Sequence, residues 1–238
     1  MITKIPTVAV IIPSYNESKN LAILIPNVFR ILPDAHVIVV DDSIGYEKKQ
    51  TDQVCCKIGR NITYISRNGK LGRGSAVIEG IKKALSLKSI QTCIEMDADL
   101  AHDPKEFHIL LSKIGTVDMV IGSRYMDGSR IVKWPFSRLF QSKIINFVLK
   151  YWLGLQISDY TNGFRAYNRK SCEYLSSIEL HEKGFISLSE VAYKLQKKGF
   201  TIAEVPITFT DRKFGKSNAN FKELITSLLG VIRIRLTA

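Results

Sequence analysis

Two aspartates, Asp97 and Asp99, follow a short apolar stretch and are separated by a single alanine. A third carboxylate, Asp103, precedes Pro104, and that pair is typical of the start of a helix. Asp97 and Asp99 lack this explanation, because like charges at the end of a strand repel each other unless a cation lies between them. Carboxylate oxygens are preferred ligands of Mg²⁺ and Mn²⁺, and either ion can bridge two phosphates. The spacing therefore predicts a divalent metal site for a phosphorylated ligand, although an Asp-x-Asp pair also arises by chance.

A glycine-rich segment, NGKLGRGSA at residues 68–76, precedes a predicted helix. Its backbone N–H groups and the start of that helix could face a diphosphate, and Lys70 and Arg73 favour an anion. The segment matches neither common phosphate-binding glycine motif. A plain turn between a strand and a helix explains it equally well.

Other polar residues follow apolar runs in the same way. Asp41 and Asp42 come after HVIVV, where a carboxylate could accept from a base N–H or a ribose hydroxyl, or could lie in a solvated turn. Arg124 follows VIGS, and guanidinium groups bind phosphate oxygens in bidentate fashion. Cationic loops are also common as solvated surface. His102 is predicted to lie at the surface or to support the aspartates rather than to bind metal.

The elements that position these residues alternate along the first half of the chain. Apolar, Val- and Ile-rich runs predict strands, and segments of helical period lie between several of them. The predicted strands are residues 7–13, 36–42, 62–66, 92–97 and 118–123, and the predicted helices are residues 20–32, 74–87 and 104–114. This pattern predicts an α/β fold with a mostly parallel sheet and helices on both faces. Ligands of such sheets bind beyond the carboxyl ends of the strands, where the polar residues above fall.

The second half has a different character. Residues 134–157 mix aromatic and aliphatic side chains with Arg138, Lys143 and Lys150, which predicts a pair of amphipathic helices. These helices could pack in the core or lie in a membrane interface. Beyond them we expect strands at 161–169 and 201–209, helices at 187–199 and 221–236, and a polar loop at 210–220. The sequence contains no repeat or linker, so a single domain is predicted.

Composition limits the class of protein. Lys and Arg number 34 and Asp and Glu 22, so the net charge of +12 favours nucleic acid, an anionic membrane surface or phosphorylated substrates as partners. The basic residues are scattered without an aromatic stacking pattern, which ranks nucleic acid last. No apolar run reaches the roughly 18 residues of a spanning helix, and the N-terminal run is predicted to be a strand rather than a signal peptide. Four cysteines without metal-ligand spacing fit a reducing cytosol.

In combination, these motifs resemble family 2 glycosyltransferases of the GT-A (Rossmann-like) fold, and most of all the dolichol-phosphate mannose synthase group. The resemblance covers roughly residues 6–220, and the order of the motifs makes it specific. The matching segments are VIIPSYNE, VIVVDDS, NGKLGRGSAVIEGI, EMDADLAHDP, VIGSRY, SDYTNGFRAYNR, GFISLSEVAYKLQKKGFTIAEVPITF and DRKFGKS.

The resemblance implies inverting transfer of a hexose, mannose from GDP-mannose, to dolichyl or polyprenyl phosphate at the cytosolic membrane face. The chain would be cytoplasmic, peripherally bound to that face, and dependent on Mg²⁺ or Mn²⁺; a membrane-anchoring subunit is a further candidate partner. It would form one domain, residues 1–238, with a nucleotide-sugar half at 1–125 and an acceptor half with interfacial helices at 126–238. Two alternatives stay open: a polyprenyl-phosphate glucosyltransferase that uses a UDP-sugar, and a catalytically silent membrane-surface subunit.

The resemblance also implies roles for individual residues. The nucleoside would be held by Pro13, Tyr15, Glu17 and Asp41, with Lys70 nearby. The metal and donor would be held by Asp97 and Asp99, and the diphosphate by Arg212 in the loop that also carries Lys216. The lipid phosphate would be held by Arg124, Arg138 and Ser142, and Asp159 would lie near the sugar. Two positions depart from the family pattern: Ala101 replaces a glutamine that can bind the metal, and Asn218 replaces a lysine.

Overall fold

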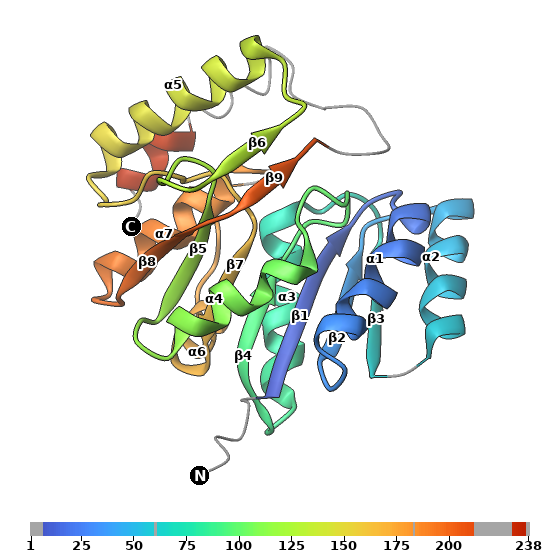
Figure 1. Ribbon diagram of the computed structural model, residues 1–238. Helices are drawn as coiled ribbons and strands as arrows, with labels where there is room; N and C mark the ends of the chain where they lie inside the picture. The colour runs from blue at the N-terminus through green and yellow to red at the C-terminus, as the bar shows by residue number, and fades with distance from the viewer. Residues whose placement is uncertain (1–6, 60, 183, 212–229, 237–238) are drawn as a thin grey trace.

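The computed structural model describes residues 7–59, 61–182, 184–211 and 230–236 (Figure 1). Its centre is a seven-stranded sheet with the strand order β3-β2-β1-β4-β7-β5-β8. Its strands are β1 (Thr7–Ser14), β2 (His36–Asp41), β3 (Ile62–Ser66), β4 (Ile90–Glu95), β5 (Met119–Ser123), β7 (Arg165–Asn168) and β8 (Ile202–Pro206). Strand β7 runs antiparallel to its neighbours β4 and β5, and the other pairs are parallel. The predicted mostly parallel sheet is confirmed.

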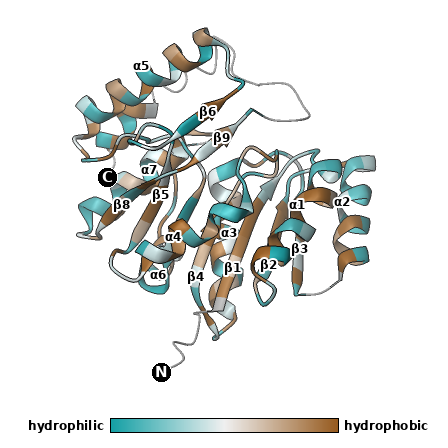
Figure 2. Ribbon diagram, viewed as in Figure 1, coloured by the Kyte–Doolittle hydropathy of each residue, from teal (hydrophilic) through white to brown (hydrophobic). Residues whose placement is uncertain are grey.

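Both faces of the sheet are apolar, because successive side chains of a strand point to opposite sides. Val8, Val10 and Ile12 pack on one face, whereas Ala9 and Ile11 pack on the other. The first face is covered by α1 (Ser18–Ile31), α2 (Gly45–Ile58) and α4 (Phe107–Ile114), and the second by α3 (Arg73–Ser86), α6 (Arg169–Ser177) and α7 (Ile186–Lys197). Figure 2 shows the central strands as mainly hydrophobic between these helices.

The carboxyl ends of four strands meet at one edge of the sheet. In the strand register Ser14 pairs with Asp41 and Asp41 with Ser66, and β4 ends at Glu95 beside β1. The loop after β4 leads to a short 3₁₀ turn, Pro104–Glu106. Asp103 caps that turn through a bond from the Lys105 backbone N–H (3.0 Å), as its sequence context predicts.

Above this sheet lie a small two-stranded ribbon and one long helix (Figure 1). The ribbon pairs β6 (Arg130–Val132) with β9 (Thr208–Thr210), and α5 spans Phe136–Leu153. The prediction of a helix pair at residues 134–157 is wrong. A single helix begins after Pro135 and ends at Gly154, which adopts the left-handed conformation that stops a helix (φ +71°).

Within the described ranges, none of the helices combines the length and the hydrophobicity that crossing a bilayer requires. Residues 230–236 are helical, in agreement with part of the last predicted helix. The rest of that helix, and Arg212, Lys216 and Asn218 of the polar loop, lie outside the described residues.

Candidate active site

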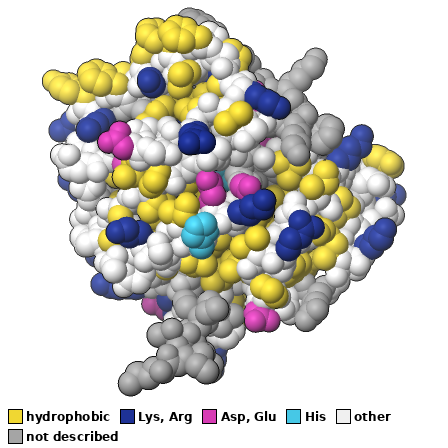
Figure 3. All heavy atoms as spheres, in the orientation of Figure 1, with side chains coloured by type: hydrophobic (Ala, Val, Ile, Leu, Met, Phe, Trp, Pro, Cys, Tyr) yellow, Lys and Arg dark blue, Asp and Glu magenta, His cyan; other side chains and the backbone are white. Residues whose placement is uncertain are grey.

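A cleft of about 210 Å³ opens at the carboxyl ends of the strands. It collects six residues that the sequence analysis assigned to the donor and metal: Pro13, Tyr15, Glu17, Lys70, Asp97 and Asp99. The rest of its lining is Ser14, Asp42, Gly72, Arg73, Ala76 and Ala98. On the face of the molecule in Figure 3, acidic side chains lie near the centre with Lys and Arg beside them. The predicted convergence of several strand ends on one site is therefore present in the fold, and we call this site the donor cleft.

The loop that carries the two aspartates is held by its own backbone. Leu100 adopts positive φ (+65°), an uncommon conformation for a residue with a side chain. This turn lets the Ala101 N–H donate to Asp99 Oδ1 (3.1 Å). The Ala101 side chain is buried, so position 101 contributes a backbone contact to Asp99 and no further metal ligand.

The buried side chain of His102 supports the loop that carries Asp97 and Asp99. Its ring is 1% exposed and stacks on Phe164 at a centroid distance of 4.9 Å. The Asp97 N–H donates to His102 Nδ1 (3.3 Å), so the ring proton is on Nε2 and is donated to Asn162 Oδ1 (2.9 Å). Of the two predicted places for His102, the structure shows the supporting one and excludes the surface.

Arg73 extends from the first turn of α3 to Asp97. Its Nε and Nη2 donate to Asp97 Oδ1 (2.9 and 2.7 Å), and its Nη1 donates to Glu95. Burial opposes charge on both Arg73 and Asp97, but their mutual attraction outweighs it. As a result the pKa of Arg73 is raised and the pKa of Asp97 is lowered from its ordinary value. The sequence indicated Arg73 only as part of a cationic turn and gave no sign of this contact.

The donor cleft fits a divalent ion of the Mg²⁺ or Mn²⁺ type. Asp97 keeps about a third of its side chain exposed, and Asp99 lies beside it on the cleft wall. Among the described residues there is no group of three or more His, Cys, Asp or Glu side chains that could hold a metal alone. Asp97 and Asp99 would hold such an ion, and the ion would supply positive charge to a diphosphate bound in the donor cleft.

Asp41 and Asp42 have different surroundings. Asp41 is fully buried and accepts hydrogen bonds from Ser43 Oγ (2.7 Å) and the Tyr64 hydroxyl (3.1 Å), and it does not line the donor cleft. Ser43 Oγ in turn accepts from the Asn16 N–H (2.7 Å), which fixes the loop after β1. The direct nucleoside contact predicted for Asp41 stays a prediction.

Asp42 lines the donor cleft instead and holds the glycine-rich turn. Its Oδ2 accepts from the backbone N–H groups of Leu71 (2.9 Å) and Gly72 (3.2 Å), and its Oδ1 accepts from Arg67 Nε (2.5 Å). Lys70, on the same turn, lies over the ring of Tyr15 at 5.1 Å. The turn is therefore held by the buried carboxylate of Asp42 and by Arg67, whose Nη2 donates to the Gly72 carbonyl (3.0 Å).

A second, larger pocket of about 530 Å³ lies between α5 and the loop after β5. We call it the α5 pocket; its lining is Arg124, Tyr125, Met126, Ile131, Leu139, Lys143, Asn146, Phe147, Lys150 and Ser158. Cationic side chains and apolar side chains share this lining. Such a mixture suits an anionic group attached to a hydrocarbon chain.

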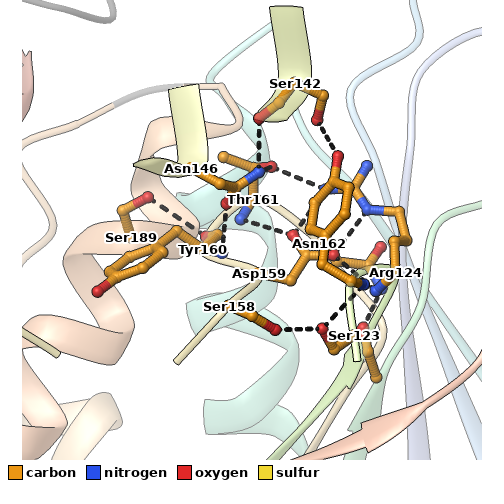
Figure 4. Close-up of polar contacts among 12 residues, drawn as sticks. Ser123, Arg124, Ser142, Asn146, Ser158, Asp159, Tyr160, Thr161, Asn162 and Ser189 are labelled. Atoms are coloured by element: carbon orange, nitrogen blue, oxygen red, sulfur yellow. Dashed lines mark hydrogen bonds and ion pairs between the residues drawn. The ribbon is translucent and has the colours of Figure 1, made fainter. Parts of the chain in front are cut away.

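Arg124 is held at the edge of the α5 pocket by Asp159 (Figure 4). Its Nε and Nη2 donate to the two oxygens of Asp159 (both 2.7 Å), and Nη2 also donates to Thr161 Oγ1 (2.8 Å). Asp159 is fully buried, and burial alone would raise its pKa, but Arg124 outweighs this and lowers it. The structure therefore pairs Asp159 with Arg124. Asp159 does not line the donor cleft, and its predicted position near the sugar stays a prediction.

The other two predicted acceptor residues lie on α5. Arg138 Nη1 donates to Asp211 Oδ1 (2.6 Å), and Ser142 Oγ accepts from the Tyr125 hydroxyl (2.6 Å). Trp134, which the sequence assigned only to a core or interface helix, lies next to two arginines. Its ring is 4.2 Å from the Arg138 guanidinium and 5.3 Å from that of Arg124. Trp134 therefore makes cation–π contacts with two of the three predicted acceptor residues.

One segment, residues 158–164, connects the two sites. Asp159 and Thr161 contact Arg124, and Asn162 contacts His102 beneath Asp97. Gly163 packs directly on the donor cleft, because an added Cβ would overlap the Arg73 guanidinium and lie 3.1 Å from Asp97 Oδ1. The donor cleft and the Arg124 side are thus built on the same stretch of chain.

Comparison with known proteins identifies the family of the chain. Residues 9–175 match the family described as Glycosyl transferase family 2. The chain belongs to this family. This family 2 glycosyltransferase is 35% identical over 219 residues to the polyprenol monophosphomannose synthase of Mycolicibacterium smegmatis, which covers 90% of this chain and 82% of that protein. It is 31% identical over 231 residues to the undecaprenyl-phosphate mannosyltransferase of Micrococcus luteus, at 97% and 95% coverage.

Solved structures share the fold of this glycosyltransferase. Glucosyl-3-phosphoglycerate synthase from Mycobacterium tuberculosis, solved with Mn²⁺, UDP and glucosyl-3-phosphoglycerate, superposes with a TM-score of 0.67 at 18% identity. The match covers 98% of this chain and 79% of that one. The predicted GT-A-type α/β fold and the predicted family are both confirmed.

Proposed function

We propose that this glycosyltransferase transfers a mannosyl group from a nucleotide sugar, GDP-mannose in the first instance, to a polyprenyl phosphate at a membrane surface. The names of two relatives that match nearly the whole chain support the sugar and the acceptor class. The observation that carries the proposal is the pairing of a carboxylate-bearing donor cleft with an adjoining pocket that is both cationic and apolar. A soluble acceptor would not require the apolar part.

The residues suggest how the reaction is supported. A phosphate monoester is largely ionised at neutral pH, because its second pKa is about 6, so the acceptor oxygen needs no general base. Arg124 and Arg138 would orient that oxygen, and the segment 158–164 fixes Arg124 relative to Asp97. A divalent ion on Asp97 and Asp99 would stabilise the negative charge of the departing nucleoside diphosphate. Attack from the side opposite the leaving group gives inversion at the anomeric carbon.

Helix α5 supports attachment to a membrane. Five of its apolar side chains are exposed and follow one another at spacings of three or four residues, which places them on one face. They are Phe136 (81% exposed), Phe140, Ile144, Phe147 (70%) and Tyr151 (84%). Figure 3 shows hydrophobic side chains along the outer surface of the molecule in the region of α5. We call this row the α5 stripe; Phe147 belongs both to it and to the α5 pocket, so a lipid could pass from the bilayer to the pocket.

Sugar transfer into lipid tests the reaction directly. Purified protein would be incubated with Mn²⁺, a polyprenyl phosphate in vesicles, and radiolabelled GDP-mannose, GDP-glucose, UDP-glucose or UDP-N-acetylglucosamine. We expect label in the organic extract with GDP-mannose. Transfer only from UDP-glucose would support the glucosyltransferase alternative. Binding of nucleotide or lipid without labelled product from any donor would support the silent subunit.

Vesicle sedimentation tests the membrane contact. We expect the wild-type chain to sediment with vesicles that contain anionic lipid and the variant F136S/F147S/Y151S to stay in solution. The matched control is I44S/Y46S, which removes two exposed apolar side chains near the start of α2, on another part of the surface (63% and 72% exposed). Equal loss of binding in both variants would refute a specific role of α5.

A further inference from the structure

Arg73 is a donor-cleft residue without an assigned role. It is buried against two carboxylates, with about 18% of its side chain exposed, and it lines the cleft beside Asp97 and Asp99. In the described part of the chain, its contacts with Asp97 all fall on one oxygen, Oδ1. The other oxygen, Oδ2, is therefore the one left to meet a ligand in the cleft.

The surroundings of Arg73 keep the guanidinium in this position. Nη1 donates to Glu95, whose other oxygen accepts from the Tyr167 hydroxyl (2.6 Å), so Glu95 is itself fixed. On the opposite side, the backbone at Gly163 lies so close that a Cβ there would overlap Nη2. Hydrogen bonds to the two carboxylates hold the guanidinium in place, so its charge is a constant part of the donor cleft.

A fixed positive charge next to a metal-binding carboxylate has two effects. It holds the carboxylate in one orientation, which favours a ligand that must be placed accurately. It also repels a divalent ion, because two like charges within a few ångströms interact strongly in a partly buried site. A diphosphate brings negative charge and offsets this repulsion.

We propose that Arg73 is a positioning residue that holds Asp97 through Oδ1 and weakens the intrinsic metal affinity of the donor cleft, so that the ion binds mainly together with the diphosphate of the donor. This inference rests on the proposed function in one respect, the divalent ion at Asp97 and Asp99. Glu95 acts in the opposite direction, because its negative charge balances part of that of Arg73.

Metal binding measured without turnover tests the proposal. Free Mn²⁺ would be followed by electron paramagnetic resonance during titration of the full chain, with and without GDP. For Arg73→Met we expect Mn²⁺ alone to bind about tenfold more tightly, as the loss of one nearby charge implies, whereas the gain in affinity from GDP shrinks. The turnover number should fall in the same variant, because Asp97 loses its fixed orientation.

Three further variants separate charge from geometry. Arg73→Lys keeps the charge but not the two-nitrogen contact, so Mn²⁺ affinity should stay within about twofold of wild type while turnover falls. Glu95→Gln should weaken Mn²⁺ binding. Lys70→Met removes a cation from the same cleft that lies over the Tyr15 ring rather than on Asp97, and it should change Mn²⁺ affinity by less than about twofold.

The outcomes are distinguishable from those of the proposed function. Tighter Mn²⁺ binding with slower turnover supports the role of Arg73, since a general structural defect would weaken both. Unchanged or weaker Mn²⁺ binding in an Arg73→Met protein with a wild-type circular dichroism spectrum overturns it, and so does the absence of Mn²⁺ binding in every variant with GDP present. If the Mn²⁺ shifts occur but wild type labels no lipid from any donor, the role of Arg73 stands and the proposed transfer fails.

Discussion

Breaking the Arg124–Asp159 ion pair should lower the thermal stability of the protein. Asp159 is fully buried and Arg124 nearly so, and three hydrogen bonds join them: two from the guanidinium (both 2.7 Å) and one from the Arg124 N–H (3.0 Å). Removal of one partner of a buried pair leaves an uncompensated charge and costs about 3–5 kcal/mol. At about 2–4 °C per kcal/mol for a chain of this size, Asp159→Asn should lower Tm by roughly 6–20 °C.

The stability that this ion pair contributes should depend on pH. Arg124 lowers the pKa of Asp159 below its ordinary value of 3.8, so the pair stabilises the fold fully above that value. The contribution is lost as the pH falls through the lowered pKa. The difference in Tm between wild type and Asp159→Asn should therefore be full at pH 7 and shrink below about pH 4.

Thermal unfolding followed by circular dichroism, with a double-mutant cycle, checks the reasoning. Arg124→Met and Asp159→Asn should each destabilise, and the double variant should be more stable than the sum of the two losses, because no charge is left without a partner. Strictly additive losses would refute the pair. An Asp159→Asn protein with wild-type Tm and no transfer would refute the structural role of Asp159 and favour the predicted role near the sugar.

Three further predictions concern ligand binding. Asp99→Ala should abolish Mn²⁺-dependent transfer and reduce Mn²⁺ binding in the presence of GDP, measured as above; undiminished turnover would remove the metal assignment. Arg138→Ala should raise the apparent KM for the lipid phosphate severalfold more than that for the nucleotide sugar in steady-state assays, and the reverse ranking would count against an acceptor role. Asp42→Asn should raise the KM for the nucleotide sugar about tenfold, because two backbone N–H groups of the glycine-rich turn lose a charged acceptor; an unchanged KM would show that the turn holds without it.

The sheet could be predicted from the sequence, because parallel strands that are buried on both faces appear as runs of Val and Ile. Two helices could not. Helix α2 reads GYEKKQTDQVCCKI and buries only Thr51 and Cys55, so it lacks an apolar period. Helix α6 is only nine residues long and buries just Ser171, Cys172 and Leu175. Both helices pack against their neighbours through few side chains, and a helix with a narrow buried stripe resembles a polar loop in sequence.

The part of the donor cleft that is formed by the ends of the strands could be predicted from the sequence. Its aspartates and the residues after β1 follow apolar runs, and parallel strands end at the same edge. The partners of Arg73 and Arg124 were not predictable. Asp159 lies 35 residues from Arg124, and Glu95 faces Arg73 only because β4 ends beside the first turn of α3. Asp41 was predicted to bind the donor, but Asp42 lines the cleft instead. The cause is simple: neighbouring residues at the end of a strand point to opposite sides.

The antiparallel strand β7 separates the two strands that lead to the donor cleft and to the α5 pocket. It is inserted between β4, which leads to Asp97, and β5, which leads to Arg124. Strands in a sheet are spaced about 4.8 Å apart, so β4 and β5 are held about 10 Å from each other. In the proposed function, a sugar would lie across this separation, between the leaving diphosphate and the incoming phosphate. The residues that enter β7 contact both sites, so the strand sets the distance and the loop before it fixes the side chains. Because β7 runs antiparallel to both neighbours, the segment that enters it lies at the carboxyl ends of β4 and β5, at the edge of the sheet where both sites open.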